Sequence, residues 1–257
     1  MKSVFLAISL VFLAFVFTTQ AQNKRKPNLP IKKPMTTKSV NETPNTAVVV
    51  DERLAVLRLE PSLYARSIQR MRRGRILAIS GAKQADGIIF YRVIVPPNNY
   101  GWVQAEAVVT KRKKGDNERL ARLVQASEGF EQIERSQLYL ENFPNSELSP
   151  TILLLLGDLA EENALKLSNE ATRRLDRSEM AATGAPLHSF YLNYAGLDRY
   201  RKLDINFIFN ANTKQFHYDG VSWKVIISKF PKSSEVEEAK KRLENLKQKM
   251  VQVTAKP

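Results

Sequence analysis

A run of short apolar segments between Ala47 and Val109 constrains the fold of this chain more than any other feature. The segments are rich in β-branched and aromatic residues, and turn-forming residues separate them. They cover Ala47–Val50, Leu54–Leu59, Ile76–Ile79, Ile88–Val95 and Gly101–Val103. Several short strands within about sixty residues predict a small β-barrel, closed so that no long edge stays unpaired.

The last two segments predict a hairpin with a binding face. Pro96-Pro97-Asn98-Asn99 separates them and favours a turn. Strand alternation places Ile89, Tyr91, Val93 and Val95 on one face and Phe90, Arg92 and Ile94 on the other. If the first set faces the core, Phe90 and Arg92 face outward and Trp102 can lie beside them.

An outward aromatic pair with a cation suits the sugar faces and peptide carboxylates of peptidoglycan. The candidate ligand-binding residues are therefore Phe90, Arg92 and Trp102. In the alternative interpretation Trp102 only covers the barrel and binds nothing.

The first residues have the pattern of a secretory signal peptide. Lys2 supplies a positive charge, Val4–Phe17 is an apolar core shorter than a membrane span, and Thr19-Gln20-Ala21 fits the cleavage rule. We expect residues 1–21 to be removed on export, which leaves no transmembrane span. An uncleaved membrane anchor is the alternative.

The absence of cysteine and the basic, proline-rich segment after the signal peptide limit the chemistry that this chain can carry out and the environment in which it works. The chain contains no cysteine, which removes disulfides, zinc–thiolate sites and thiol nucleophiles. Together with the family resemblance given below, this favours a bacterial envelope protein, periplasmic or secreted. Residues 22–46 are rich in proline and lysine and predict a disordered basic linker.

The formal net charge is +14, and basic residues also concentrate in Arg70–Arg75 and Lys111–Lys114. For an exported chain this favours peptidoglycan or another anionic envelope polymer as partner, and not nucleic acid. A solvated basic face is the alternative.

Four motifs within the strand-rich segment stand in a recognisable order: Leu54-Ala55-Val56-Leu57-Arg58 with Pro61, Arg73-Gly74-Arg75-Ile76-Leu77, Phe90-Tyr91-Arg92-Val93 and Gly101-Trp102-Val103. In this order they resemble the bacterial SH3-like (SH3b) domains. The resemblance implies a small barrel that binds cell-wall peptides or acts as a docking module. Phe90 departs from the family's pattern, which often has a ligand-facing tryptophan there.

From Asn117 onward the apolar residues recur with a helical period. The longest stripe runs from Ile152 to Leu175, and Ser149-Pro150 before it predicts a helix start with serine as N-cap. Ser234 with Glu237 predicts a capping box at the start of the last helix.

Two similar turns follow apolar helical stretches: Phe143-Pro144-Asn145-Ser146 and Phe230-Pro231-Lys232-Ser233. They resemble the turns of envelope tetratricopeptide-like (TPR) proteins, which implies helical hairpins with a concave face for a protein or peptide partner. Their phenylalanines are 87 residues apart, which is not a multiple of the ~34-residue TPR period, so a regular array is not indicated.

The segment between these turns carries an aromatic stripe from Phe190 to Tyr200, which is expected to be core. Ile205–Phe209 and Phe216–Tyr218 predict either a short hairpin or distorted helix.

Side chains suited to catalysis are few. His188 and His217 are the only histidines, neither has a partner at metal-ligand spacing, and His217 is expected to be structural. Glu161 and Glu162 are adjacent and point to different sides of a helix, so they cannot form a carboxylate dyad. We expect no enzymatic activity, no metal and no cofactor.

These patterns together predict a multidomain α+β protein. Its parts are a signal peptide (1–21), a linker (22–46), an SH3-like barrel (47–112) and an α-helical TPR-like domain (113–257). The expected function is an envelope adaptor that binds the cell wall through the barrel and a protein partner through the helices. The alternatives are an assembly protein whose barrel binds no ligand and, third, an accessory subunit of a wall hydrolase.

Overall fold

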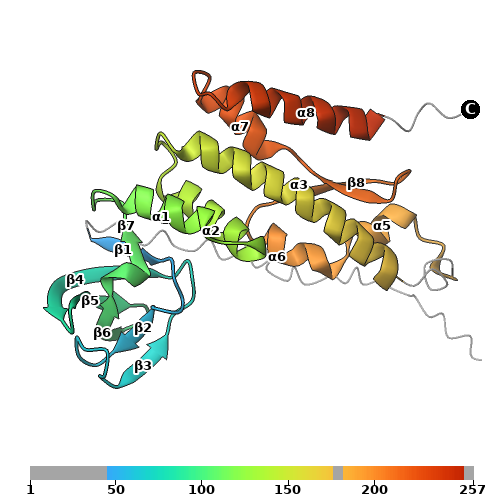
Figure 1. The fold of residues 1–257 in the computed structure, drawn as a ribbon. Helices are drawn as coiled ribbons and strands as arrows, with labels where there is room; N and C mark the ends of the chain where they lie inside the picture. The colour runs from blue at the N-terminus through green and yellow to red at the C-terminus, as the bar shows by residue number, and fades with distance from the viewer. Residues whose placement is uncertain (1–44, 176–181, 252–257) are drawn as a thin grey trace, which may run out of the picture. The chain divides into compact units, whose positions relative to one another are not determined.

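The computed structural model describes residues 45–175 and 182–251. These residues form an α+β fold in which a seven-stranded antiparallel sheet precedes a helical region (Figure 1). The predicted class and the predicted order of its two parts are confirmed. The expected signal peptide and almost all of the expected linker lie outside the described residues.

The sheet contains five strands at the predicted places and two that were not predicted, β3 and β7. The strands are β1 (Thr46–Val49), β2 (Val56–Arg58), β3 (Ser67–Arg70), β4 (Ile76–Ala85), β5 (Ile88–Val95), β6 (Asn99–Gln104) and β7 (Val108–Thr110), with a 3₁₀ turn, η1 (Ala105–Ala107), before β7. The predicted hairpin is present, because β5 pairs antiparallel with β6 from Phe90↔Gln104 to Val95↔Asn99.

The expectation of a closed barrel is wrong. The strand order is β3-β2-β6-β5-β4-β1-β7, so β3 and β7 are the two edges of an open sheet. Both edge strands are short, which leaves few backbone groups unpaired and removes the need for closure. Curvature comes instead from irregular pairing, between Leu57 and Arg58 on β2 and between Ile79 and Gly81 on β4.

One face of the sheet carries its hydrophobic core. The buried side chains include Leu57, Met71, Leu77, Val93 and Val103. Gly101 is needed for this packing, because a Cβ there would lie 2.6 Å from the Arg58 carbonyl oxygen and 2.9 Å from the Leu57 side chain. The glycine of the Gly101-Trp102-Val103 motif therefore allows β6 to approach β2 closely.

The helical region contains four longer helices and an insertion of shorter elements. Its described elements are α1 (Asp116–Gln125), α2 (Gly129–Asn142), α3 (Ser149–Arg174), α5 (Leu187–Leu192), η2 (Ala195–Leu197), α6 (Asp198–Arg201), β8 (Phe207–Asn210), β9 (Gln215–Tyr218), α7 (Val221–Lys229) and α8 (Val236–Val251).

The two predicted Phe-Pro turns have the same backbone geometry. Phe143 ends α2 with φ −130° and ψ 53°, and Phe230 ends α7 with φ −126° and ψ 52°. The N–H of Ser146 donates to the Phe143 carbonyl at 3.2 Å, and that of Ser233 donates to the Phe230 carbonyl at 3.0 Å. Each turn therefore joins two helices into a hairpin, α2–α3 and α7–α8.

The predicted serine caps are not formed. Helix α3 begins at Ser149 itself, and Ser149 Oγ donates to the Phe143 carbonyl at 2.7 Å. Ser234 Oγ donates to Glu235 Oε2 at 3.0 Å, and α8 begins only at Val236. The compact turn determines where each helix starts, so these hydroxyls stabilise the turn and do not accept from the first turn of the helix.

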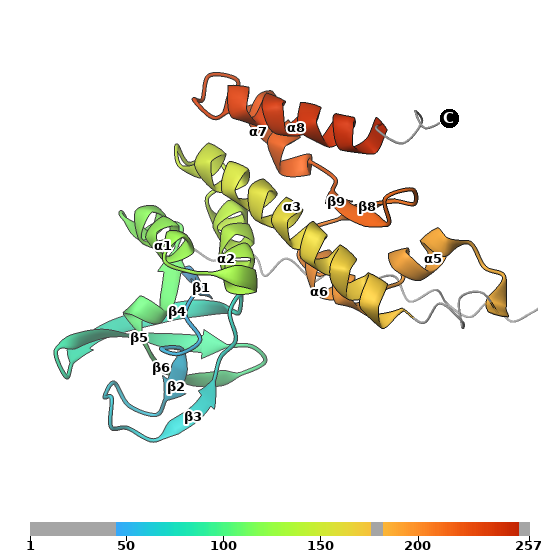
Figure 2. The same ribbon diagram turned by 45° about the vertical axis from the view of Figure 1, so that its right-hand side comes forward.

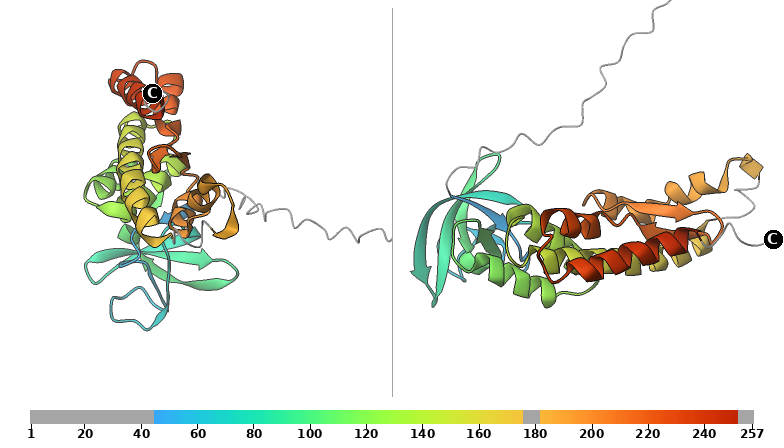
Figure 3. Two further views of the ribbon diagram at one scale, coloured as in Figure 1. Left: turned by 90° about the vertical axis from the view of Figure 1, so that its right-hand side faces the viewer. Right: turned by 90° about the horizontal axis from the view of Figure 1, so that it is seen from above.

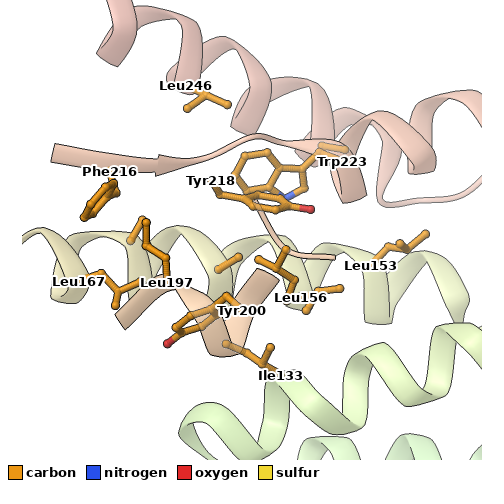
Figure 4. Close-up of a cluster of buried hydrophobic side chains, with 14 of the residues drawn as sticks. Ile133, Leu153, Leu156, Leu167, Leu197, Tyr200, Phe216, Tyr218, Trp223 and Leu246 are labelled. Carbon is orange, nitrogen blue, oxygen red and sulfur yellow. The ribbon is translucent and has the colours of Figure 1, made fainter. Parts of the chain in front are cut away.

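The insertion supplies much of the helical core. Strands β8 and β9 pair antiparallel, which confirms the hairpin alternative for this segment (Figure 2). Tyr191, Leu197 and Tyr200 from the predicted aromatic stripe are buried in the same cluster as Phe216 and Trp223 (Figure 4). The stripe is therefore core.

Helices α3 and α8 run side by side (Figure 3). Two ion pairs join them: Arg242 with Asp158, at 2.9 Å, and Lys249 with Glu161, at 2.6 Å. The predicted apolar faces of both helices are buried in the shared core, including Leu156 and Ala160 of α3 and Ala239 of α8.

The sheet and the first two helices share a third cluster of buried side chains. Val50 and Val109 pack with Leu120, Val124 and Tyr139. Two ion pairs of Arg73, which precedes β4, add to this contact: Arg73–Glu131 and Arg73–Glu134, both at 2.5 Å. Arg135 of α2 pairs with Glu131 on the same helix at 2.9 Å and approaches Asp51, which follows β1, to 4.0 Å. The sheet is thus packed directly on α1 and α2. None of the described helices is both long enough and apolar enough to cross a lipid bilayer.

Candidate functional site

Three side chains form a row across neighbouring strands of the sheet. Trp102 on β6 lies directly opposite Arg92 on β5 and, on its other side, directly opposite Arg58 on β2. Directly paired residues project from the same face of a sheet, with Cβ atoms about 5 Å apart. An indole is therefore placed between two guanidinium groups on the face opposite the core residues Val93 and Val103. This set is called the Arg58–Trp102–Arg92 row.

The three members of the row differ in accessibility. Arg92 is exposed, and Arg58 and Trp102 are half-buried. Arg58 Nη1 donates to the Ala65 carbonyl at 2.8 Å, and Arg58 Nε is buried with no hydrogen-bond partner among the described residues. Gly81 is paired with Arg92 and adds no side chain beside it. The row can therefore offer an aromatic face and donors to a ligand.

Phe90 does not belong to this site, and its predicted outward exposure is wrong. Its side chain is 0% exposed, whereas Ile89, which was expected in the core, is 48% exposed. Strict alternation assumes one covered face along the whole strand. The register shift between Ile79 and Gly81 bends the β4–β5 hairpin next to Arg92, so the beginning and the end of β5 have different surroundings.

The loop between β2 and β3 borders the row with exposed apolar side chains. Leu59 and Leu63 are exposed, and Tyr64 is 91% exposed. Ile68 on β3, just after the loop, is exposed as well. Asp86 holds the loop, because one of its carboxylate oxygens accepts from Ser62 Oγ and from the Leu63 N–H, both at 2.7 Å. These bonds lower the pKa of the Asp86 carboxyl. The loop and the β4–β5 turn therefore form one connected rim.

Arg58 and the loop were missed by sequence reasoning. Arg58 stands at the end of a recognised motif, but its pairing opposite Trp102 depends on register between strands distant in sequence. Tyr64 lies in a stretch without strand periodicity. A search for exposed aromatic residues in the turn after β2 is the signal that could have found it.

The helical region contains a partly buried polar cluster around Glu161, in which a carboxylate contacts a histidine as in many catalytic sites. Glu161 Oε1 contacts His217 Nδ1 at 3.0 Å and accepts from Lys249 Nζ at 2.6 Å, while Oε2 accepts from the Tyr218 N–H at 2.8 Å. Burial raises the pKa of Glu161, but these contacts outweigh it and lower the pKa to about 2. The carboxylate stays charged and fully engaged, which makes it a poor general acid or base.

Three other carboxylates considered in the sequence, those of Glu162, Asp198 and Asp219, have structural contacts. Glu162 pairs with Lys166 at 2.6 Å, away from Glu161, as the sequence predicts. Asp198 pairs with Arg201 at 3.1 Å, and Asp219 Oδ1 accepts from the Val221 N–H at 3.0 Å at the start of α7. Over residues 45–175 and 182–251, no three His, Asp or Glu side chains are grouped so that they could hold a metal ion.

Comparison with known proteins finds no matching protein-family model, no matching curated protein and no matching solved structure.

Proposed function

We propose that this chain is a non-enzymatic adaptor of a bacterial envelope, which binds peptidoglycan through its sheet and a protein partner through its helical region. The observation that carries the proposal is the Arg58–Trp102–Arg92 row. An indole can stack on a sugar ring, and guanidinium groups bind the carboxylates of the peptide stems. The wall polymer presents both chemistries along its length.

Three features support this location and class. The pattern in residues 1–21 predicts export. The four motifs that resemble SH3b domains begin just before β2, just before β4, on β5 and on β6, which supports a domain of that type in an open form. The two equivalent Phe-Pro turns support a TPR-like arrangement of the α2–α3 and α7–α8 hairpins.

A purely structural role is the second candidate function, and one observation favours it. Trp102 is half-buried, and the sheet region is joined to α2 by the ion pairs of Arg73 with Glu131 and Glu134, as expected for a sheet that only supports the helices. In that case neither Trp102 nor Arg92 contributes to wall binding. An accessory role in wall hydrolysis is the third candidate, and turnover of peptidoglycan by the chain would favour it.

Co-sedimentation with purified sacculi tests the proposal. The chain from Gln22 onward should sediment with sacculi at low salt and should retain part of this binding at high salt, because stacking on Trp102 is not screened. Trp102→Ala should remove the salt-resistant part, a loss of about 1–3 kcal/mol if the indole stacks on a sugar as it does on a base.

Arg92→Ala should weaken binding, while Arg72→Ala, which removes an exposed cation outside the row, should have little effect. Thermal melting of each variant shows whether it is folded. Salt-resistant binding that survives Trp102→Ala in a folded protein would exclude the row as the wall site. Binding that vanishes at high salt, or never appears, would favour the structural role.

A further inference from the structure

A groove of about 700 Å³ lies between the loop that joins β7 to α1 and the turn that joins α2 to α3. Lys111–Lys114 line one side, and residues 142–148, which include the first Phe-Pro turn, line the other. It is called the basic groove below. It lies apart from the Arg58–Trp102–Arg92 row in sequence and uses none of its residues.

Arg112 and Lys114 carry charges that are available to a ligand. Like Lys111 and Lys113, they are exposed. Arg112 and Lys114 form no ion pair with any described residue, and Lys113 Nζ lies 6.0 Å from the centre of the Tyr91 ring. Glu118 and Glu147 are the carboxylates among the described lining residues, so the groove carries an excess of positive charge.

An apolar pocket adjoins the groove along α1. It has a volume of about 240 Å³, and Ala121, Leu148 and Ile152 give it an apolar lining. Glu118 and Leu148 line both spaces, so the two spaces are neighbours. A ligand that fills both must combine negative charge with an apolar side chain.

We propose that the basic groove and its apolar pocket bind an acidic peptide segment that carries one aliphatic side chain, contributed by the protein partner. This inference rests on the proposed adaptor function and specifies the chemistry of that partner. Carboxylates complement the Lys111–Lys114 loop, and an aliphatic side chain of the peptide enters the pocket. A phosphate polymer would satisfy the loop but would leave the pocket unfilled, so the peptide is the better occupant.

Fluorescence anisotropy with a defined probe tests this site on the chain from Gln22 onward. The probe is a fluorescein-labelled peptide of aspartate and glutamate with one central leucine. It should bind, and replacing its leucine by serine should weaken binding by about tenfold, the equivalent of 1.4 kcal/mol. The double variant Arg112→Ala/Lys114→Ala should weaken binding by at least that factor, whereas Arg72→Ala/Lys83→Ala, which removes two exposed cations from the sheet, should not.

Three results would overturn the proposal. The acidic probe does not bind, both double variants weaken its binding equally, or the probe binds equally well when its leucine is replaced by serine. Poly(glycerol phosphate) that competes with the probe and binds more tightly would replace the peptide by an anionic polymer as occupant. Sacculus binding by the parent chain separates the two proposals. If the parent chain binds sacculi while the probe fails to bind to it, the partner chemistry is wrong and the wall-binding function stands.

Discussion

Replacing Arg135 by methionine should lower the free energy of unfolding by about 3 kcal/mol, because it removes one partner from a buried charge network. The Arg135 side chain is 3% exposed, and it contacts the Val50 carbonyl, Ser127 Oγ, Glu131 and, at 4.0 Å, Asp51. Methionine fills a similar volume but leaves the Asp51 and Glu131 carboxylates with fewer partners. Because the network joins the sheet to α2, we expect a single, lower melting transition by calorimetry.

Arg53→Met is the matched control for this substitution. Arg53 also donates to Asp51, at 3.1 Å, but its side chain is 79% exposed, so solvent screens the pair and the loss of stability should be much smaller. Two well-separated transitions in the parent protein would contradict the account, since they would show that the sheet and the helices do not unfold together.

The effect of Arg135→Met should also depend on pH. Burial opposes ionisation of Asp51, but its bonds to Arg53 and the nearby charges of Arg53 and Arg135 lower its pKa below the ordinary 3.8. A carboxyl whose pKa is lowered by folding contributes stability above its unfolded pKa and loses it as the pH falls through the folded value. The difference between parent and variant should therefore shrink below about pH 4.

Gly157→Ala should lower the free energy of unfolding by about 2 kcal/mol, although alanine is the better helix former. Gly157 is buried on α3, where the Trp223 ring of α7 packs against its backbone. A Cβ there would lie 2.6 Å from Ser222 Oγ, 2.7 Å from Trp223 Cε2 and closer still to Trp223 Nε1. Helices α3 and α7 must therefore move apart in the variant. We expect its melting temperature to fall and its tryptophan fluorescence to differ from that of the parent, because the surroundings of Trp223 change.

Gly81→Ala makes the same chemical change in a place that has room. A Cβ at Gly81 would be 3.9 Å from Arg92 Cβ, the nearest atom outside the adjacent residues, and this is an ordinary van der Waals distance. The change in stability should stay within about 0.5 kcal/mol. Equal stability of Gly157→Ala and the parent would show that α3 and α7 are not in close contact.

Local patterns in the sequence predict most elements of this fold. Strand β5 occupies the predicted residues, the apolar stripe from Ile152 onward forms α3, and the Phe-Pro turns end α2 and α7. Each of these depends on side chains within a few residues of one another. Turn residues and periodic apolar positions are local properties, so they can be identified without knowing the rest of the structure.

Features that depend on distant segments could not be predicted in the same way. The open strand order and the pairing of Arg58 with Trp102 require the register between strands separated by many residues. The burial of Phe90 follows from bending of the β4–β5 hairpin, which simple alternation does not include. The basic groove arises because the loop before α1 folds against the α2–α3 turn. The sequence identifies the Lys111–Lys114 run and the Phe-Pro turn separately, but it does not predict that they lie together.

A bridging assay tests the adaptor function most directly. Sacculi are mixed with the labelled acidic peptide, with and without the chain from Gln22 onward, and the peptide in the pellet is measured. The peptide should sediment only when the protein is present, and both Trp102→Ala and Arg112→Ala/Lys114→Ala should lower the amount of peptide in the pellet, each by weakening a different contact. If the protein sediments fully while a peptide that it binds in solution stays in the supernatant, the two surfaces are not occupied together and the chain is not an adaptor.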